Sequence, residues 1–574
     1  MNNNKYILGI HDGHNCGASI CLNGKIICSV LEERITRKKN EVGYPRKAIE
    51  ECLKIANIDA KELDKVVIAS NFMHHPSYLK DISSWYLVGK NEQKLDKKIS
   101  KEYEKSVFLQ RKKQRIKNVL SHINVEDNLI CFLEHHLAHL AAAYYTAPNV
   151  KINKPILGLT CDGAGDGLCA TVSICKNNNI TRIGSTNRHA SLGKIYSRIT
   201  MLLGMKPWEH EYKIMGLAPY ADQEVAKFES KKLHNLLKFS NNGLDFKLNS
   251  SLSTNYSYFY LKEKFERVRF DNIAGAVQSF TEDMLVKWIK KAIKKTKIRD
   301  IVCGGGVFMN VKANMLIQNL SEVKSMYVMP SASDESLSIG AALYFYYNKY
   351  KIFNNENGIM ENLYLGSELS KKDLSTTIKK IKNSNNYTIK ENFDFDNVIS
   401  NLLASGEPIA ICNGRTEWGA RALCNRSIIA KAGSREIVEK INSQIKMRDF
   451  WMPFAPTILD KKYDLCIEDK KNIKPEFMTF ALPAKKKYYS KLAGAMHPVD
   501  KTCRPQIIKK TSNKKIYNML KNYCDKYNEC GVLQTSFNIH GEPIVNSAND
   551  AFSTVNRSGL KYLILDKYLV SKKK

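Results

Sequence analysis

YILGIHDGHNCGASICLNGKIICSVLEE, residues 6–33, decides the first part of the fold. The runs 6–10 and 18–22 have the Ile- and Leu-rich character of buried strands, and an Asp/Gly-rich loop separates them. Asn23-Gly24 is the strongest short signal for a hairpin, and the apolar run after it supplies a returning strand. A β-sheet is therefore predicted to begin at residue 6.

A second stretch, PILGLTCDGAGDGLCATVSIC at 155–175, repeats the arrangement of two strands around an Asp/Gly turn. Further along, a predicted strand ends in Gly304-Gly305-Gly306. Glycine allows backbone N–H groups to approach a phosphate closely, because no Cβ stands in the way. Two such turns and a glycine-rich strand end are what an ATP-binding cleft between two actin-like lobes requires. The sequence thus predicts an α/β fold with a two-lobed, actin-like (ASKHA) N-terminal domain.

Composition places a domain boundary in the Asn-, Gly- and Glu-rich stretch 354–366. We expect an N-terminal domain over 1–355 and a C-terminal α/β domain over 366–574. Within the first domain, the Lys-rich residues 74–125 are predicted to form an inserted helical excursion.

The chain of 574 residues is large enough for several domains and has ordinary globular composition, which excludes wholesale disorder. Its 89 Lys and Arg residues exceed its 57 Asp and Glu residues by 32, a balance that fits nucleic acid, an anionic surface or phosphorylated small molecules. The 15 cysteines form no C-x-x-C pair and are predicted to be free thiols. Without a targeting segment or an apolar run of about 18 residues, we expect a cytoplasmic protein with no membrane contact.

A histidine-rich motif, Glu134-His135-His136-Leu137-Ala138-His139, opens a predicted helix. His135 and His139 are four residues apart and share one helix face, so both imidazoles can reach one cation. A carboxylate from Asp162 or Asp166, together with Asp334, could complete the ligands. This mixed set suits Fe(II), Mn or Zn and is unlike a closed, thiolate-rich structural zinc site.

The C-terminal domain carries a different polar constellation, made of guanidinium, ammonium, amide and hydroxyl groups. Such groups hold phosphate and acyl-phosphate oxygens, and the arginines stand among Gly, Asn and Ser, which favours a pocket over a nucleic-acid groove. The motifs are GRTEWGARALCNRS (414–427), KMR (446–448), Arg504 and TSFN (535–538).

Several long motifs, in their order along the chain, resemble those of the O-carbamoyltransferases of the nodulation and antibiotic-tailoring family. They are GIHDGHN, LEERITRKKN, EHHLAH, DGAGDG, KPWEHEYKIMGLAPY, GGGVFMN, GRTEWGARALCNRSI, MPFAPT and TSFNIHGEPIV. The resemblance runs nearly end to end. It implies that the N-terminal domain transfers carbamoyl groups and that the C-terminal domain is similar to threonylcarbamoyl-adenylate synthases (YrdC-like). It further implies that carbamate derived from carbamoyl phosphate attacks the α-phosphate of Mg-ATP to give carbamoyl adenylate, whose carbamoyl group passes to a hydroxyl of a small molecule.

The resemblance also assigns roles to individual residues. It places Lys446, Arg504 and Ser536 at the adenylate-forming site. It makes His14 the base for the acceptor hydroxyl, although Asn15 stands where many relatives have Asp. The metal ligands would be His135, His139 and Asp334, joined by Asp162, with Fe(II) as the first choice of metal. The remaining expected substrate-binding residues are Gly304, Gly305 and Asn310 beside the nucleotide, and Arg415, Arg421, Asn425 and Arg448 in the second domain.

The expected partners are ATP, carbamoyl phosphate and a hydroxyl acceptor such as a sugar or sugar-bearing metabolite; a homodimer is compatible with this interpretation. Two alternatives differ in class. The positive charge would also suit a tRNA-modifying enzyme of the threonylcarbamoyl type, although nucleic acid is not the expected partner. A non-catalytic module that only senses ATP is disfavoured by the His, Lys, Arg and Ser residues named above.

Overall fold

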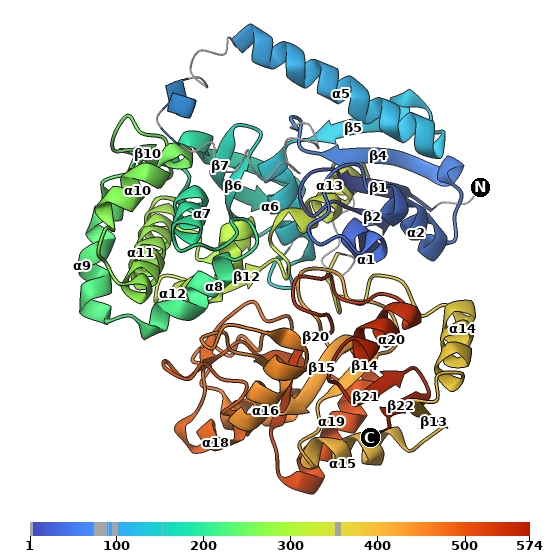
Figure 1. Cartoon of the computed structure of the whole chain (residues 1–574). Helices are drawn as coiled ribbons and strands as arrows, with labels where there is room; N and C mark the ends of the chain where they lie inside the picture. The colour runs from blue at the N-terminus through green and yellow to red at the C-terminus, as the bar shows by residue number, and fades with distance from the viewer. Residues whose placement is uncertain are drawn as a thin grey trace. The chain divides into compact units, whose positions relative to one another are not determined.

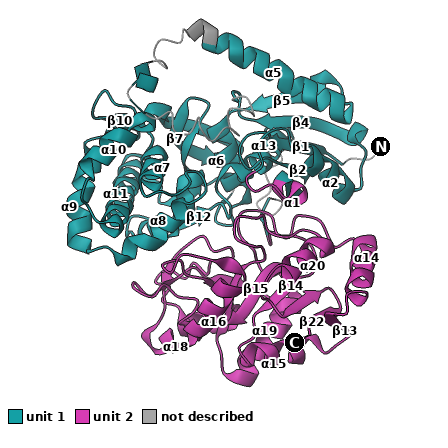
Figure 2. Ribbon diagram, in the orientation of Figure 1, with its two compact units in different colours: residues 1–32, 41–360 teal, residues 33–40, 361–574 magenta. Residues whose placement is uncertain are grey.

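The computed structural model describes residues 4–73, 89, 91–94, 101–151, 153–350 and 358–573, which form two compact units (Figures 1 and 2). Unit 1 comprises residues 1–32 and 41–360, and unit 2 comprises residues 33–40 and 361–574. The expected domain end at 355 and part of the expected excursion at 74–125 lie outside the described residues; within that excursion a long helix, α5 (Lys101–Ile123), is present. No described helix has both the length and the apolar character needed to span a bilayer.

The first sheet of unit 1 has the strand order β3-β2-β1-β4-β5. The first three strands are antiparallel neighbours, whereas β4 and β5 run parallel to β1. Asn23 and Gly24, with φ of 50° and 86°, form the predicted hairpin turn. The strands are β1 (Tyr6–His11), β2 (Gly17–Leu22), β3 (Lys25–Leu31), β4 (Leu63–Ala69) and β5 (Ile130–Leu133).

The second sheet of unit 1 repeats this topology, with the order β12-β11-β6-β7-β8. Again three antiparallel strands are followed by two parallel ones, and Asp166 and Gly167 form the turn between the first two. The α/β class is therefore confirmed, and the repeated sheet is the arrangement that an actin-like pair of lobes requires. The strands are β6 (Ile156–Gly165), β7 (Leu168–Lys176), β8 (Asn179–Asn187), β11 (Asp300–Gly304) and β12 (Ser325–Val328).

Two helices, α6 (His135–Thr146) and α13 (Leu337–Tyr350), pack against each other between these sheets (Figure 1). Glycine makes the close approach possible, because a methyl group on Gly340 would overlap the carbonyl oxygen of Ala138. A methyl group on Gly9 of β1 would likewise overlap the carbonyl oxygen of Ser338. The start of each helix is thereby fixed, which matters because both starts carry functional side chains.

The rest of unit 1 is mainly helical. Its further elements are α1 (Glu32–Thr36, continuing into unit 2), α2 (Arg46–Ala56), α7 (Leu192–Leu202), α8 (Glu211–Leu217), α9 (Gln223–His234), α10 (Tyr258–Lys264), α11 (Phe270–Thr296), α12 (Val311–Gln318), β9 (Leu237–Phe239) and β10 (Phe246–Leu248).

Unit 2 contains a mixed eight-stranded sheet of order β13-β22-β21-β14-β15-β20-β16-β19. Its core includes apolar side chains of α15 and α19 that pack on the central strands. The sheet strands are β13 (Tyr387–Glu391), β14 (Ile409–Cys412), β15 (Arg426–Lys431), β16 (Ala455–Leu459), β19 (Gln506–Ile508), β20 (Gly531–Ser536), β21 (Tyr562–Leu565) and β22 (Tyr568–Lys572), with a separate pair β17 (Leu482–Pro483) and β18 (Thr502–Cys503). The helices are α14 (Lys371–Lys382), α15 (Phe395–Ala404), α16 (Arg435–Ile441), α17 (Asp460–Cys466), α18 (Tyr489–Leu492), α19 (Lys514–Tyr527) and α20 (Ala548–Asn556).

A short segment from near the N-terminus, residues 33–40, belongs to unit 2 (Figure 2). The Arg37 guanidinium donates hydrogen bonds to the carbonyls of Pro543 and Ile544, at 2.8 and 2.6 Å. Arg34 is buried and donates to the carbonyl of Gly419 at 2.6 Å. The sequence analysis did not predict that residues 33–40 belong to the second unit. All 15 cysteines are free, as predicted.

Candidate functional site

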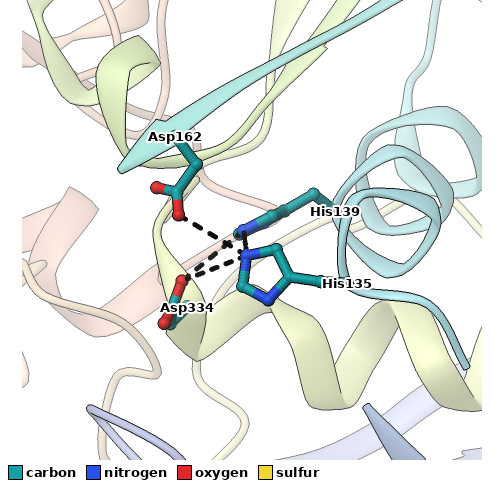
Figure 3. A group of neighbouring side chains, drawn as sticks. All are labelled: His135, His139, Asp162 and Asp334. Carbon is teal, nitrogen blue, oxygen red and sulfur yellow. Dashed lines mark hydrogen bonds and ion pairs between the residues drawn. The ribbon is translucent and has the colours of Figure 1, made fainter. Parts of the chain in front are cut away.

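Four side chains of unit 1 converge on one point: His135, His139, Asp162 and Asp334 (Figure 3). One donor atom of each lies within 4.8 Å of the others. His135 Nε2 is 3.4 Å from Asp162 Oδ2, and His139 Nε2 is 3.5 Å from Asp334 Oδ1. The structure thus brings together the four residues that the sequence analysis named as metal ligands. We call them the His/Asp cluster.

The two histidines are aimed by the start of α6. Glu134 caps that helix by accepting hydrogen bonds from two backbone N–H groups in its first turn. On the far side of each ring, His135 Nδ1 pairs with Ser70 Oγ at 2.9 Å, and His139 Nδ1 pairs with Ser336 Oγ at 3.1 Å. Such partners fix ring orientation, so both Nε2 atoms face the cluster.

Asp162 is held by the glycine-rich strand end. The N–H of Gly306 donates to Asp162 Oδ1 at 2.8 Å, which leaves Oδ2 facing His135. Gly305 has φ of +94°, and a methyl group there would overlap the carbonyl of Cys161. A methyl group on Gly304 would press on the carbonyl of His139. These glycines therefore pack directly behind the cluster; their contact with a nucleotide stays a prediction.

The third residue predicted to border the nucleotide, Asn310, pairs its side chain with Gln278 and caps α12. Asp166, the alternative ligand, has another task, because its carboxylate accepts the backbone N–H groups of Asn71, Phe72 and His135 at 2.8 Å each. It therefore positions the backbone around the histidine, and Asp162 supplies a carboxylate of the His/Asp cluster.

Electrostatics in the cluster favour charged carboxylates beside a protonated imidazole. Burial by itself would lower the pKa of His135, but the hydrogen bond to Asp162 and the charge of Asp334 raise it to about 9. Burial also opposes ionisation of Asp162, yet the histidines hold its pKa below the usual value. A cation bound here would replace that proton. Two imidazole nitrogens and two carboxylate oxygens fit a divalent ion such as Fe(II), Mn or Zn.

The loop after β1 is anchored by a buried ion pair. Asp12 accepts two hydrogen bonds from Arg115 of α5, at 2.7 and 2.8 Å. In the same loop, His11 Nε2 lies 3.0 Å from the carbonyl oxygen of His14 and 3.8 Å from Asp334 Oδ2. The loop that carries His14 is therefore tied to the His/Asp cluster.

Two residues near His14 were missed by the sequence analysis, Lys194 and Trp208. The rings of His14 and Trp208 lie 6.0 Å apart in an edge-on arrangement, and Lys194 Nζ lies 4.7 Å from the centre of the indole. Burial and the neighbouring Arg198 lower the pKa of Lys194 to about 8, although Asp162 acts in the opposite direction. Lys194 stands in the stretch LGKIYSRIT (192–200), which also resembles the family, but the sequence analysis assigned this lysine no role and only the fold reveals its place.

In unit 2, Lys446 and Ser536 lie together. Lys446 Nζ donates to Ser536 Oγ at 3.2 Å and to Asn538 Oδ1 at 2.7 Å. Arg448 donates to the neighbouring Thr535 Oγ1 at 2.9 Å. Burial holds the pKa of Lys446 well below its usual value. The positive charges of Arg448 and of Lys39, which lies in the segment 33–40, act in the same direction.

The other predicted residues of unit 2 lie on segments that connect its strands. Arg504 lies on the connection between β18 and β19. Arg415 donates to the carbonyls of Leu365 and Gly366, at 2.8 and 3.0 Å. Arg421 donates to the carbonyl of Met478, and Asn425 donates to the carbonyl of Arg415. In this structure the last three organise loop backbone; their contact with substrate stays a prediction.

The chain matches two protein-family models: Carbamoyltransferase N-terminus over residues 6–343 and Carbamoyltransferase C-terminus over residues 400–572. The chain belongs to the carbamoyltransferase family. The resemblance indicated by the motifs is therefore confirmed, and the protein is a carbamoyltransferase enzyme.

Relatives of this carbamoyltransferase match nearly its whole length. An uncharacterized protein of Methanocaldococcus jannaschii is 32% identical over 99% of this chain and 100% of its own. Nodulation protein NolNO of Sinorhizobium fredii is 26% identical, over 98% of this chain and 79% of its own. Among solved structures, HypF from T. kodakarensis is 12% identical with a TM-score of 0.33, over 62% of this chain and 49% of its own, too distant to support an argument.

Proposed function

We propose that this carbamoyltransferase uses ATP and carbamoyl phosphate to form carbamoyl adenylate and then transfers the carbamoyl group to a hydroxyl of a sugar or sugar-bearing metabolite. One observation carries the proposal: each unit holds its own polar site. Unit 1 has the His/Asp cluster, and unit 2 has the buried Lys446 beside Ser536. The two sites suit two successive reactions.

Unit 2 would form the mixed anhydride. Carbamate released from carbamoyl phosphate attacks the α-phosphorus of Mg-ATP, a new O–P bond forms, and pyrophosphate leaves. The Lys446 ammonium and the Ser536 hydroxyl, which in this structure bond to each other and to Asn538, would turn their N–H and O–H donors to the phosphoryl oxygens and stabilise the negative charge that grows there. Arg504 would add a second cation to this site.

Unit 1 would carry out the transfer. His14 accepts the proton of the acceptor hydroxyl, whose oxygen then bonds to the carbamoyl carbon, while the bond from that carbon to the phosphate oxygen breaks and AMP leaves. A divalent ion held by the His/Asp cluster would supply Lewis-acid polarisation and balance negative charge. Ser70 and Ser336 keep the two imidazoles oriented for that ion.

The direct test incubates the purified protein with carbamoyl phosphate, ATP, Mg²⁺ and either Fe²⁺, Mn²⁺ or Zn²⁺, and follows AMP, pyrophosphate and carbamoyl adenylate by mass spectrometry. Lys446→Met should stop the formation of AMP and adenylate. The exposed Lys510→Met removes an equal charge from unit 2 and should change neither product. If no AMP or adenylate appears with any of these metals, the proposed mechanism is wrong.

The second half of the mechanism is tested with His14→Asn, assayed with a panel of nucleotide sugars as acceptors. This variant should still form the adenylate but fail to carbamoylate any acceptor that the wild type uses. Equal loss of both activities in the folded Lys446→Met and His14→Asn variants would contradict two separate sites. If the wild type modifies tRNA in preference to every small-molecule acceptor, that result would favour the tRNA-modifying alternative.

A further inference from the structure

Lys194 stands at the edge of the His/Asp cluster, in the first turn of α7. Ser191 caps this helix by accepting the N–H of Lys194 at 3.1 Å, and its hydroxyl lies 2.7 Å from the carbonyl oxygen of Gly163. The first turn of α7 is therefore fixed to the end of β6, directly after Asp162. A Cβ placed on Gly163 would lie 3.9 Å from Lys194 Nζ, so the absence of a side chain there leaves the ammonium open on that side.

No described residue accepts a hydrogen bond from this ammonium. Among the residues that the structure describes, Lys194 Nζ makes no hydrogen bond and no ion pair; its one close partner is the face of Trp208. The nearby carboxylates are engaged elsewhere, because Asp162 contacts His135 and Gly306, and Glu211 accepts the N–H of Trp208 at 2.7 Å. A partly buried cation with unused donors calls for an anion.

Trp208 fixes the direction of Lys194. Its φ of +68° is unfavourable for a bulky side chain, and the hydrogen bond to Glu211 helps to hold that conformation. In this conformation the indole contacts Lys194 on its face and lies 6.0 Å from His14. Lys194 and His14 therefore flank one aromatic ring.

We propose that Lys194 binds the phosphate of the carbamoyl donor in unit 1, with the leaving nucleoside monophosphate as its ligand. This inference rests on the proposed function and deepens it. During transfer, the carbon–oxygen bond to the phosphate breaks and its electron pair stays on the phosphate oxygen, while the acceptor oxygen bonds to the carbamoyl carbon and gives its proton to His14. The ammonium of Lys194 would meet the charge gained by the phosphate.

The test compares binding of AMP and of adenosine by isothermal titration calorimetry with Mn²⁺ present. All proteins carry Lys446→Met, so that the site proposed for unit 2 does not contribute. A hydrogen bond between two charged groups predicts that Lys194→Met weakens AMP binding about 10-fold to 100-fold. Adenosine lacks the phosphate, so its affinity should not change. Lys194→Arg should retain the preference for AMP.

The matched control is Lys154→Met, which removes an exposed lysine of unit 1 and should bind AMP like the parent. If Lys194→Met does not fold, Lys194→Gln serves for the same comparison. The assignment is overturned if the parent binds AMP no better than adenosine, or if AMP and adenosine lose affinity equally. Failure of the proposed function looks different: the wild type then forms no AMP from ATP and carbamoyl phosphate, whatever residue stands at 194.

Discussion

Metal binding at the His/Asp cluster should release a proton near neutral pH. Without metal, the pKa of His135 is raised to about 9, so nearly every molecule at pH 7.5 carries a proton on this ring. A metal ion binds only the neutral imidazole and must displace that proton. The competition at pH 7.5 therefore weakens metal binding about 30-fold, or about 2 kcal/mol, relative to binding by the fully neutral ring, because each pH unit below the pKa counts tenfold.

Calorimetric titration with Mn²⁺ in two buffers of different ionisation enthalpy measures both quantities. We expect release of about one proton at pH 7.5, and an affinity that rises about tenfold from pH 7 to pH 8, less steeply from pH 8 to pH 9, and then levels off. His139→Asn should lower the affinity, whereas His234→Gln removes a histidine of α9 outside the cluster and should not. An affinity that is constant between pH 7 and 9, with no proton released, would refute the reasoning.

The raised pKa of His135 also makes the stability of the metal-free protein depend on pH. Because the folded-state pKa of His135 lies above the ordinary value of 6.5, its protonation stabilises the folded state fully below pH 6.5. That contribution, about 3 kcal/mol, is lost as the pH rises to about 9. Urea titrations of the metal-free wild type at pH 6 and pH 9 measure the difference, and added metal should abolish most of it.

Three substitutions test the packing around the two sites. Asp12→Asn leaves the buried guanidinium of Arg115 without its counter-charge and should cost about 3–5 kcal/mol in urea unfolding; a loss below about 1 kcal/mol would contradict this. Gly305→Ala should lower the thermal midpoint and weaken metal binding together, because the new methyl group meets the Cys161 carbonyl; an unchanged midpoint would show that the strand end can yield. Lys446→Met should abolish AMP formation yet keep or raise the free energy of unfolding, by about 1 kcal/mol, because it removes a buried charge; a large loss of stability would show that the ammonium holds the fold.

Local sequence patterns predicted the strands and the cluster because their signals are short-ranged. The hairpin at Asn23-Gly24 depends on adjacent residues, and the spacing of His135 and His139 depends on one helical turn. Asp162 and Asp334 were recognised because each stands in a polar motif at the end of an apolar strand or before a helix. Each of these features can be recognised without knowledge of distant contacts.

Residues that orient the cluster had no such signal. Ser70 meets His135 across 65 positions, and Arg115 meets Asp12 across 103, from within a Lys-rich stretch that reads as a solvated helix. The glycines at 304 and 305 were recognised as sites of close approach, but the sequence could not say that the approaching groups are the carbonyls of His139 and Cys161. Tertiary packing, which local propensity does not encode, decides such contacts.

The assignment of residues 33–40 to unit 2 changes how the enzyme can be dissected. A fragment that begins at residue 361 would lack Arg34 and Arg37, and the carbonyls of Gly419, Pro543 and Ile544 would lose the donors that cover them. A fragment of residues 1–360 would keep Arg34 and Arg37 but would lack the carbonyl groups to which they donate hydrogen bonds. The polypeptide crosses from one unit to the other three times, so neither half is a contiguous gene segment. To produce unit 2 on its own, residues 33–40 must therefore be joined to residues 361–574 in one rearranged chain.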